Sequence, residues 1–403
     1  MADSENYFIL ESNKNLAFIS SYSDIPLKQP LMQVLEEEGI REPLPLHKQC
    51  LQSFLDEPQV MLFIPPATGK ALLLCLGIFQ LIDINLNQPQ VIIVEPRKYL
   101  IDEMAIVLEK WGKYLSPTIV QTTGENDRNA DLAKIQNSQI VIGTSGRLNN
   151  FLKFNQSLFR HVSLIVIDAG GGIHQPNSSK NAEERKDWVD QGNAVFGIIN
   201  KLNKNVKKWW ISNPTNEESF IKRVTKNPRN LLTISAKFQV AVAGGLIHYK
   251  LDCTDEVDKL QKLKHLLSRD PEKQKIIFCK KENLEKLQTE IGNSYGDILL
   301  FSNQMDKNQL KEMLESFRNR QYLIGICPSK GFLMRQLDTK DPIEIYNYDI
   351  AKSKKKYLRR IRRNGFFKQG DKVFNFPINE EEKDKLAKIE RKYSYEMQNL
   401  SLD

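Results

Sequence analysis

Residues 60–71 read VMLFIPPATGKA, and this stretch decides the fold. It begins with an apolar strand pattern, Val60 to Ile64, continues as a short loop that contains Gly69 and Lys70, and leads into an apolar helical segment, Ala71 to Ile82. A strand, a tight loop with Gly-Lys and a helix form the context in which backbone N–H groups and a helix N-terminus hold phosphate. The stretch therefore predicts an α/β unit with a phosphate loop.

Two departures make this loop an incomplete nucleotide fingerprint. Ala67 stands where the first glycine belongs, and the methyl group of Ala71 replaces the hydroxyl that would bind Mg²⁺. By itself the remaining Gly-Lys pair is a weak signal, because a chance helix start gives the same two residues. The surrounding sequence has to decide between the two interpretations.

Short β-branched runs alternate with amphipathic helical segments along the rest of the chain. The further strands that we expect are 91–94, 118–121, 140–142, 164–167, 209–211, 246–251, 275–278, 298–301, 323–326, 343–347 and 372–376. The further helices that we expect are 99–114, 129–136, 189–202, 256–267, 283–291 and 307–317. Alternation of this kind implies parallel strands with crossover helices on both faces of a sheet.

The length of the chain, 403 residues, exceeds a single ordinary core, so two domains are expected. The alternation breaks at Thr233 to Gly245, which lacks helical periodicity and ends in a glycine pair. We therefore expect an N-terminal domain over residues 1–232, a linker over 233–245 and a C-terminal domain over 246–403.

Composition narrows the class of protein. Fifty-eight Lys and Arg against 50 Asp and Glu give a net charge of +8, with both signs mixed along the chain. The five cysteines are odd in number and never in C-x-x-C spacing, which argues against a disulfide framework and a zinc site. No secretory signal is visible, and no apolar run reaches the roughly 20 residues that a membrane span needs. We expect an intracellular, cytoplasmic protein with no membrane partner, the nucleus and a cytoskeletal or ciliary complex being alternative locations.

The order of further motifs resembles the DEAD-box RNA helicases, most of all their translation initiation factor 4A branch. The resemblance runs from about Tyr22 to the C-terminus. The matching segments, in chain order, are Tyr22, Gly39 to Pro43 with His47 in place of a glutamine, the phosphate loop, Pro96 to Leu100, Thr144 to Arg147, Asp168 to Gly171, Ser212 to Pro214, Phe278, Arg335 to Asp338, Asn347 to Asp349 and Arg359 to Phe366. The resemblance implies two RecA-like parallel-sheet domains joined by a short linker, with nucleotide and RNA bound in the cleft between them.

The resemblance also implies the positions of two binding sites. Its nucleotide contacts would be Tyr22 on the base, Thr68, Gly69, Lys70, Asp168, Asp338 near the ribose, and Arg363 as an arginine finger. Its RNA-backbone contacts would be Arg97, Lys98, Thr144, Gly146 and Arg147. No metal site and no catalytic residue are expected, because the residues of hydrolysis are replaced.

Three substitutions remove the chemistry of ATP hydrolysis that the family performs. Ala169 stands where a carboxylate orients the attacking water, Ala71 removes a Mg²⁺ ligand, and Phe366 stands at the second arginine finger. Loss of a positioned general base costs on the order of 10²- to 10⁴-fold in rate, and loss of an arginine finger on the order of 10³-fold or more. We therefore predict a pseudo-ATPase that requires no cofactor. ATP or ADP would bind weakly, or Lys70 would pair with Asp168 in a loop that holds no nucleotide.

Two functions follow from these departures. The first is a non-catalytic adaptor or structural subunit of a larger protein assembly, with the polar excursion Asn177 to Asp187 exposed to partners. The alternative is an RNA clamp that works without ATP, or a very slow RNA-dependent ATPase, with RNA bound independently of its sequence. The basic run Lys352 to Arg363 is expected to form a helix whose apolar stripe, Tyr357, Leu358 and Ile361, docks while its cations fan outward.

Overall fold

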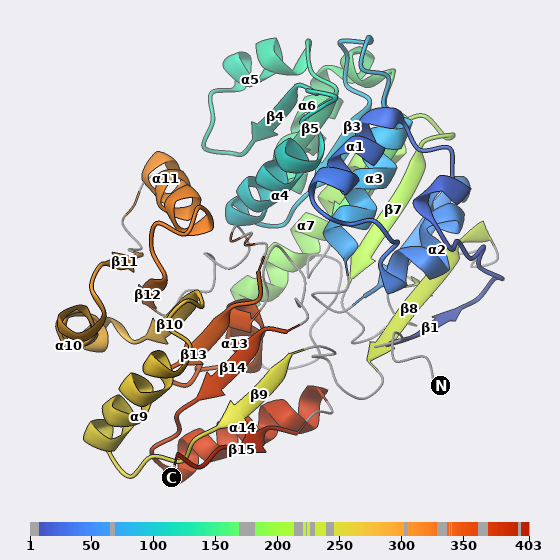
Figure 1. The fold of residues 1–403 in the computed structure, drawn as a ribbon. Helices are drawn as coiled ribbons and strands as arrows, with labels where there is room; N and C mark the ends of the chain where they lie inside the picture. Colours follow the sequence, from blue (N-terminus) through green and yellow to red (C-terminus); the bar gives the residue numbers. More distant parts are fainter. Residues whose placement is uncertain are drawn as a thin grey trace. The chain divides into compact units, whose positions relative to one another are not determined.

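The computed structural model describes residues 8–64, 69–168, 182–212, 221–222, 224–225, 230–238, 246–301, 305, 307–328, 337, 339, 341–361, 370–393 and 396–402. The chain divides into two compact units, whose common border falls between Lys237 and Phe238. Each unit contains one sheet with helices packed against it (Figure 1). Among the described residues, no helix combines the length and the apolarity that crossing a membrane requires.

An eight-stranded sheet forms the centre of the first unit. Its strands lie in the order β1 (Phe8–Ser12), β8 (Leu232–Phe238), β2 (Gln59–Phe63), β7 (Lys207–Ser212), β6 (Leu164–Asp168), β3 (Val91–Val94), β5 (Ile140–Gly143) and β4 (Ile119–Thr122). Its helices are α1 (Gln29–Glu37), α2 (Pro45–Asp56), α3 (Lys70–Leu81), α4 (Lys98–Trp111), α5 (Arg128–Ile135), α6 (Ser145–Phe154) and α7 (Ala182–Lys201). From β2 to β4 the neighbouring strands are parallel, so their carboxyl ends meet at one edge.

The first sheet is covered on both faces because successive residues of a strand point to opposite sides. On one face, Trp209 packs against Phe54 of α2 with ring centroids 4.0 Å apart. On the other face, Phe63 and Trp210 join a core cluster with residues of α5, α6 and α7. Gly77 of α3 allows a close approach, because an added Cβ would lie 2.6 Å from the Trp209 ring.

A seven-stranded sheet forms the centre of the second unit. Its strands lie in the order β11 (Ile298–Leu300), β12 (Ile324–Pro328), β10 (Lys275–Cys279), β13 (Glu344–Asn347), β14 (Lys372–Asn375), β9 (Ile247–Lys250) and β15 (Gln398–Asn399), all parallel to their neighbours. Its helices are α9 (Glu256–Arg269), α10 (Leu284–Tyr295), α11 (Lys307–Arg318), α13 (Lys354–Ile361) and α14 (Glu380–Tyr393). One face packs against α11, α13 and α14, and the other against α9 and α10.

The structure corrects two predictions about segments. Residues 233–238, predicted as the start of a linker, belong to β8, and residues 233–235 pair with β2. The β-branched Thr233 and Ile234 favour this extended pairing, and residues 239–245 lie outside the described residues. Of the polar excursion predicted at Asn177 to Asp187, residues 182–187 are the first turns of α7, because Glu, Arg and Lys are good helix formers. Residues 177–181 lie outside the described part of the chain.

Candidate functional site

The phosphate loop leads from β2 into α3. Gly69 has a φ of 90°, in the left-handed region that favours glycine, and Lys70 is the first residue of the helix. The Lys70 ammonium lies 3.0 Å from a carboxylate oxygen of Asp168, at the end of β6. These two side chains are 28% and 18% exposed. This is the ion pair that the sequence predicts for a loop without nucleotide, and whether the loop binds a nucleotide stays a prediction.

A buried hydrogen-bonded chain connects this loop to the N-terminal segment. The Nε2 atom of His47 lies 3.2 Å from the carbonyl oxygen of Gly69, and Nδ1 lies 2.8 Å from the hydroxyl of Tyr22. Because a carbonyl oxygen only accepts, Nε2 is the donor, and Nδ1 accepts the Tyr22 proton. Burial lowers the pKa of His47 to about 4, so the ring is neutral at physiological pH, while burial raises the pKa of Tyr22.

The hydrogen-bonded chain gives Tyr22 a structural contact, while its predicted contact with a base stays a prediction. Its side chain is 1% exposed and His47 is 0% exposed, so neither ring offers an open face on which an adenine could stack. Both nitrogens of His47 are already used, which leaves no group on the ring to recognise a base. Tyr22 therefore supports the phosphate loop through His47 in this structure.

The described residues make up only part of the site that the resemblance assigns to ATP·Mg²⁺. Tyr22 and His47 are buried, and Lys70 is paired with Asp168. Within the described ranges, no group of three or more His, Cys, Asp and Glu side chains is arranged to hold a metal ion. Six residues that the resemblance assigns to the site or to its loss lie outside the described residues: Ala67, Thr68, Ala169, Asp338, Arg363 and Phe366.

The predicted RNA contacts meet at the carboxyl edge of the first sheet. Strands β3 and β5 are parallel neighbours, and α4 begins just beyond β3 while α6 begins just beyond β5. Arg97 is the N-cap of α4 and Lys98 its first residue, and both are exposed. Thr144 is the N-cap of α6, and Gly146 in its first turn is exposed, with open space where a Cβ would stand. Two adjacent helix N-termini with two cations form a surface suited to phosphate.

Two of the cations predicted to contact RNA form ion pairs with acidic side chains. Lys98 forms an ion pair with Glu125, both largely exposed, on the loop that follows β4. Arg147 donates to the carbonyl oxygen of Asn126 at 2.7 Å and pairs with Asp131 at 3.2 Å. The Arg147 guanidinium also lies 4.8 Å from the Phe151 ring centroid.

Arg147 makes an internal ion pair in this structure, and its contact with RNA stays a prediction. Its side chain is 12% exposed and that of Asp131 only 4%, so the pair lies below the surface. A buried carboxylate needs a charged partner, and Arg147 supplies it. We assign Arg147 to anchoring the loop after β4, next to the exposed surface formed by Arg97, Lys98 and Gly146.

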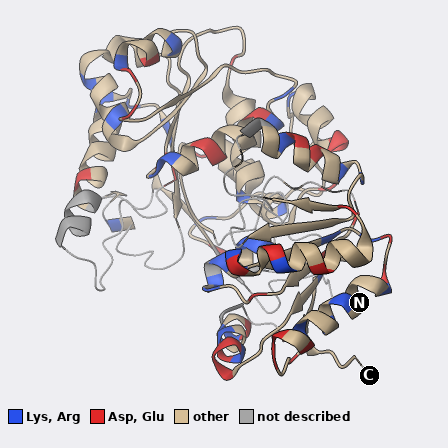
Figure 2. Cartoon of the chain, turned by 90° about the vertical axis from the view of Figure 1, so that its left-hand side faces the viewer, with Lys and Arg blue, Asp and Glu red and all other residues tan. Residues whose placement is uncertain are grey.

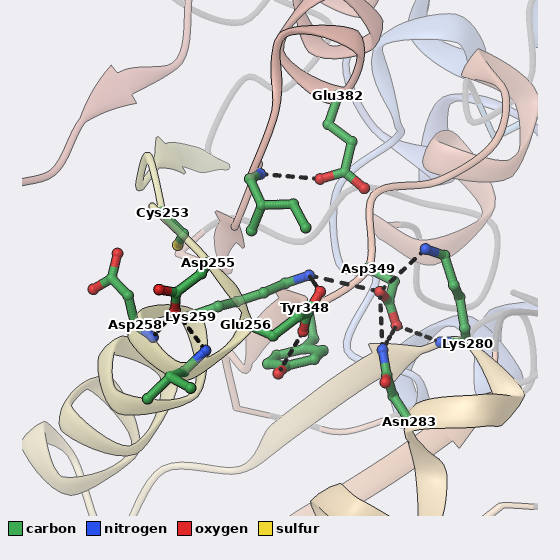
Figure 3. A network of polar contacts seen from close by, with 12 residues as sticks. Cys253, Asp255, Glu256, Asp258, Lys259, Lys280, Asn283, Tyr348, Asp349 and Glu382 are labelled. Atoms are coloured by element: carbon green, nitrogen blue, oxygen red, sulfur yellow. Dashed lines mark hydrogen bonds and ion pairs between the residues drawn. The ribbon is translucent and has the colours of Figure 1, made fainter.

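A second polar cluster surrounds Asp349 at the carboxyl edge of the second sheet (Figure 3). The Asp349 carboxylate accepts hydrogen bonds from the backbone N–H of Lys280 at 2.5 Å and from Asn283 Nδ2 at 3.0 Å. The ammonium groups of Lys259 and Lys280 lie 3.6 and 3.7 Å from the same carboxylate. Lys259 is fully buried, 4.5 Å from the ring centroid of Tyr348. Asp349 thus connects the turn after β10 to the end of β13.

An open pocket of about 640 Å³ borders this cluster. The residues that line it are Glu256, Lys280, Lys281, Glu282, Asn283 and Lys352. Cations and carboxylates alternate around it, so its charge favours no single class of ligand.

The basic helix α13 docks as predicted through Tyr357, Leu358 and Ile361, which are buried. One cation departs from the prediction. Arg360 is 2% exposed and points inward, where it donates to Asn347 Oδ1 at 3.0 Å and to the carbonyl oxygen of Asp349 at 2.6 Å. Burial lowers its pKa to about 10, so it stays charged at neutral pH. Its hydrogen bonds hold α13 against the strand end, which explains why it does not fan outward.

The chain is similar in sequence to known proteins. Residues 44–180 match the family model of the DEAD/DEAH box helicases. This chain is a distant relative of the DEAD-box RNA helicases. The ATP-dependent RNA helicase FAL1 of Candida glabrata is 22% identical over 397 residues, which cover 98% of this chain and 96% of that protein. The probable eukaryotic initiation factor 4A of Trypanosoma cruzi is 22% identical over 405 residues, which cover 98% and 95%.

The fold comparison agrees with the sequence relatives. Saccharomyces cerevisiae Dbp5 bound to RNA and ADP BeF3 is similar to this helicase relative with a TM-score of 0.63 and 17% sequence identity, over 95% of this chain and 96% of Dbp5. The predicted fold, two RecA-like parallel α/β domains, is confirmed.

Proposed function

We propose that this helicase relative binds single-stranded RNA along its phosphate backbone and does not couple binding to ATP hydrolysis. The observation that carries the proposal is the meeting of two helix N-termini at the ends of β3 and β5, with Arg97 and Lys98 on one and Thr144 and Gly146 on the other. Backbone N–H groups and cations at such a surface recognise phosphates and not bases. Relatives named as ATP-dependent RNA helicases, and a similar structure bound to RNA, support RNA as the ligand class.

The loss of hydrolysis is proposed from the sequence and supported by the burial of Tyr22 and His47. Ala71, Ala169 and Phe366 replace groups on which phosphoryl transfer depends. Because Tyr22 and His47 are fully buried, an adenine would have to displace an existing contact. Weak binding of ATP or ADP through the remaining loop residues and Arg363 is compatible with this proposal, and RNA binding does not require it.

A second candidate is the non-catalytic adaptor in a protein assembly. One observation favours it, namely that Lys98 and Arg147 already form ion pairs with acidic side chains of the same unit. Cations that are already paired contribute less to RNA affinity and leave a surface of mixed charge. Protein partners would then account for the retained fold.

Salt dependence separates the two candidates. The dissociation constant of a fluorescent oligouridine is measured by anisotropy over a series of salt concentrations, for the full chain and for Lys98→Ala. An RNA clamp shows a steep loss of affinity with salt, and Lys98→Ala lowers the logarithmic slope by about 1. Lys14→Ala is the matched control, because Lys14 also pairs with a glutamate, Glu57. Lys14 follows β1, the edge strand at the end of the sheet opposite to β4. Weak binding with no response to Lys98→Ala would favour the adaptor.

A further inference from the structure

An exposed aromatic ring lies between two cations on the first unit. Phe154, the last residue of α6, is 60% exposed. The Arg128 guanidinium lies 5.0 Å and the Lys153 ammonium 5.2 Å from its ring centroid. We call these three residues the Phe154 platform.

The Phe154 platform differs from the other charged surfaces of this unit. Figure 2 shows Lys and Arg beside Asp and Glu on many helices, and Lys98 and Lys113 illustrate this through their ion pairs with glutamates. Among the described residues, Arg128 and Lys153 form no ion pair with a carboxylate, unlike Lys98, Lys113 and Arg147. The neighbouring carboxylate of Asp127 caps α5 by accepting from the Ala130 N–H. Two cations without an acidic partner therefore flank a ring that is mostly exposed to solvent.

The chain connects this platform to the surface proposed for RNA. The loop after β4 contacts that surface twice, through Glu125 with Lys98 and through the Asn126 carbonyl with Arg147. Arg128 follows directly as the first residue of α5. Along α6, Phe154 lies eight positions after Gly146, a rise of about 12 Å. The platform is thus next to the candidate RNA surface and continues it away from the ends of β3 and β5.

We propose that the Phe154 platform extends the RNA site by stacking one unpaired base on the ring while Arg128 and Lys153 attract the adjoining phosphates. This inference rests on the proposed RNA-binding function. Aromatic side chains that alternate with cations are the common means of holding single strands without reading sequence, because every base has a π face. An acidic protein surface would use the two cations but would gain little from the exposed ring, on which a base stacks by displacing one of the cations.

The test compares two RNA lengths. The affinities of an oligouridine of about 6 nucleotides and one of about 15, which bracket the site sizes of single-strand-binding modules, are measured by anisotropy with the full chain. Phe154→Ala is expected to weaken the longer RNA about tenfold, as loss of one stacked base does, and to leave the shorter one unchanged. Phe154→Tyr keeps the ring and should restore the affinity. Phe18→Ala is the matched control, because Phe18 is a similarly exposed phenylalanine, 65% exposed, in the same unit.

The outcomes separate this inference from the function on which it rests. If RNA binds with a steep salt dependence but Phe154→Ala behaves like Phe18→Ala at both lengths, the platform is not an RNA contact and the proposed function stands. If neither RNA binds, the proposed function fails and the inference fails with it. Binding of polyglutamate that Lys153→Glu abolishes, without any effect of Phe154→Ala on RNA, would assign the platform to an acidic protein instead.

Discussion

The buried His47 of α2, which contacts the phosphate loop at Gly69, should make the stability of the first unit depend on pH. His47 is neutral in the folded chain down to a pKa of about 4, whereas its ordinary value is 6.5. Between these two pH values the unfolded chain carries a proton on this ring that the folded chain lacks, so stability falls as the pH falls. At 1.36 kcal/mol per pH unit, this difference corresponds to about 3 kcal/mol at full effect.

The perturbation is His47→Gln, which removes the titrating ring and keeps a side chain with a donor and an acceptor. We expect wild type to lose about 3 kcal/mol more than His47→Gln between pH 7 and pH 4. Urea unfolding followed by tryptophan fluorescence measures this in one unit alone, because Trp111, Trp188, Trp209 and Trp210 are all in the first unit. The buried His248, whose pKa burial lowers to about 3, lies in the other unit and does not contribute to this signal.

The control is His161→Gln, which replaces an exposed histidine of the same unit by the same substitution. Identical pH profiles for wild type and His47→Gln would refute the reasoning, because His47 would then titrate equally in the folded and unfolded chains. Its hydrogen bonds to Tyr22 and Gly69 could not be the ones described.

Three further predictions concern the same unit and the cysteines. Glu125→Gln releases Lys98 and should tighten RNA binding by up to about fivefold at low salt, an effect that disappears at high salt; unchanged affinity would mean that Lys98 does not contact RNA. Arg147→Ala leaves the buried carboxylate of Asp131 without its cation and should lower the free energy of unfolding by about 3 kcal/mol in the tryptophan assay, and a loss below about 0.5 kcal/mol would show that the pair is not an anchor. All five cysteines are free and buried with raised thiol pKa values, so the native chain should react with Ellman's reagent far more slowly than the chain in denaturant.

The sequence predicts the fold well because its signals are local. Apolar runs such as Val91 to Val94 are fully buried central strands, and a continuous apolar run is what a parallel strand covered on both faces requires. Gly69 and Lys70 identify the start of α3 because this signal, too, is local in the sequence. The strand β8 escapes prediction because its pairing with β2 depends on residues about 170 positions earlier, a contact that no local pattern reveals.

Pairings between distant side chains limit the prediction of the site. Lys98 and Gly146, which the resemblance assigns to one RNA site, lie at one edge of the sheet, since the ends of parallel strands meet there. The inward turn of Arg147 depends on Asp131, and nothing in the sequence distinguishes that carboxylate from an exposed one. Arg360 is likewise one cation among many in its run, until the strand end at Asn347 offers it buried acceptors.

Phosphate release from ATP·Mg²⁺, measured while anisotropy shows RNA bound to the same sample, tests the central claim most directly. We expect RNA to bind and the full chain to release phosphate no faster than Lys70→Ala does. Release that RNA stimulates and that Lys70→Ala abolishes would contradict it.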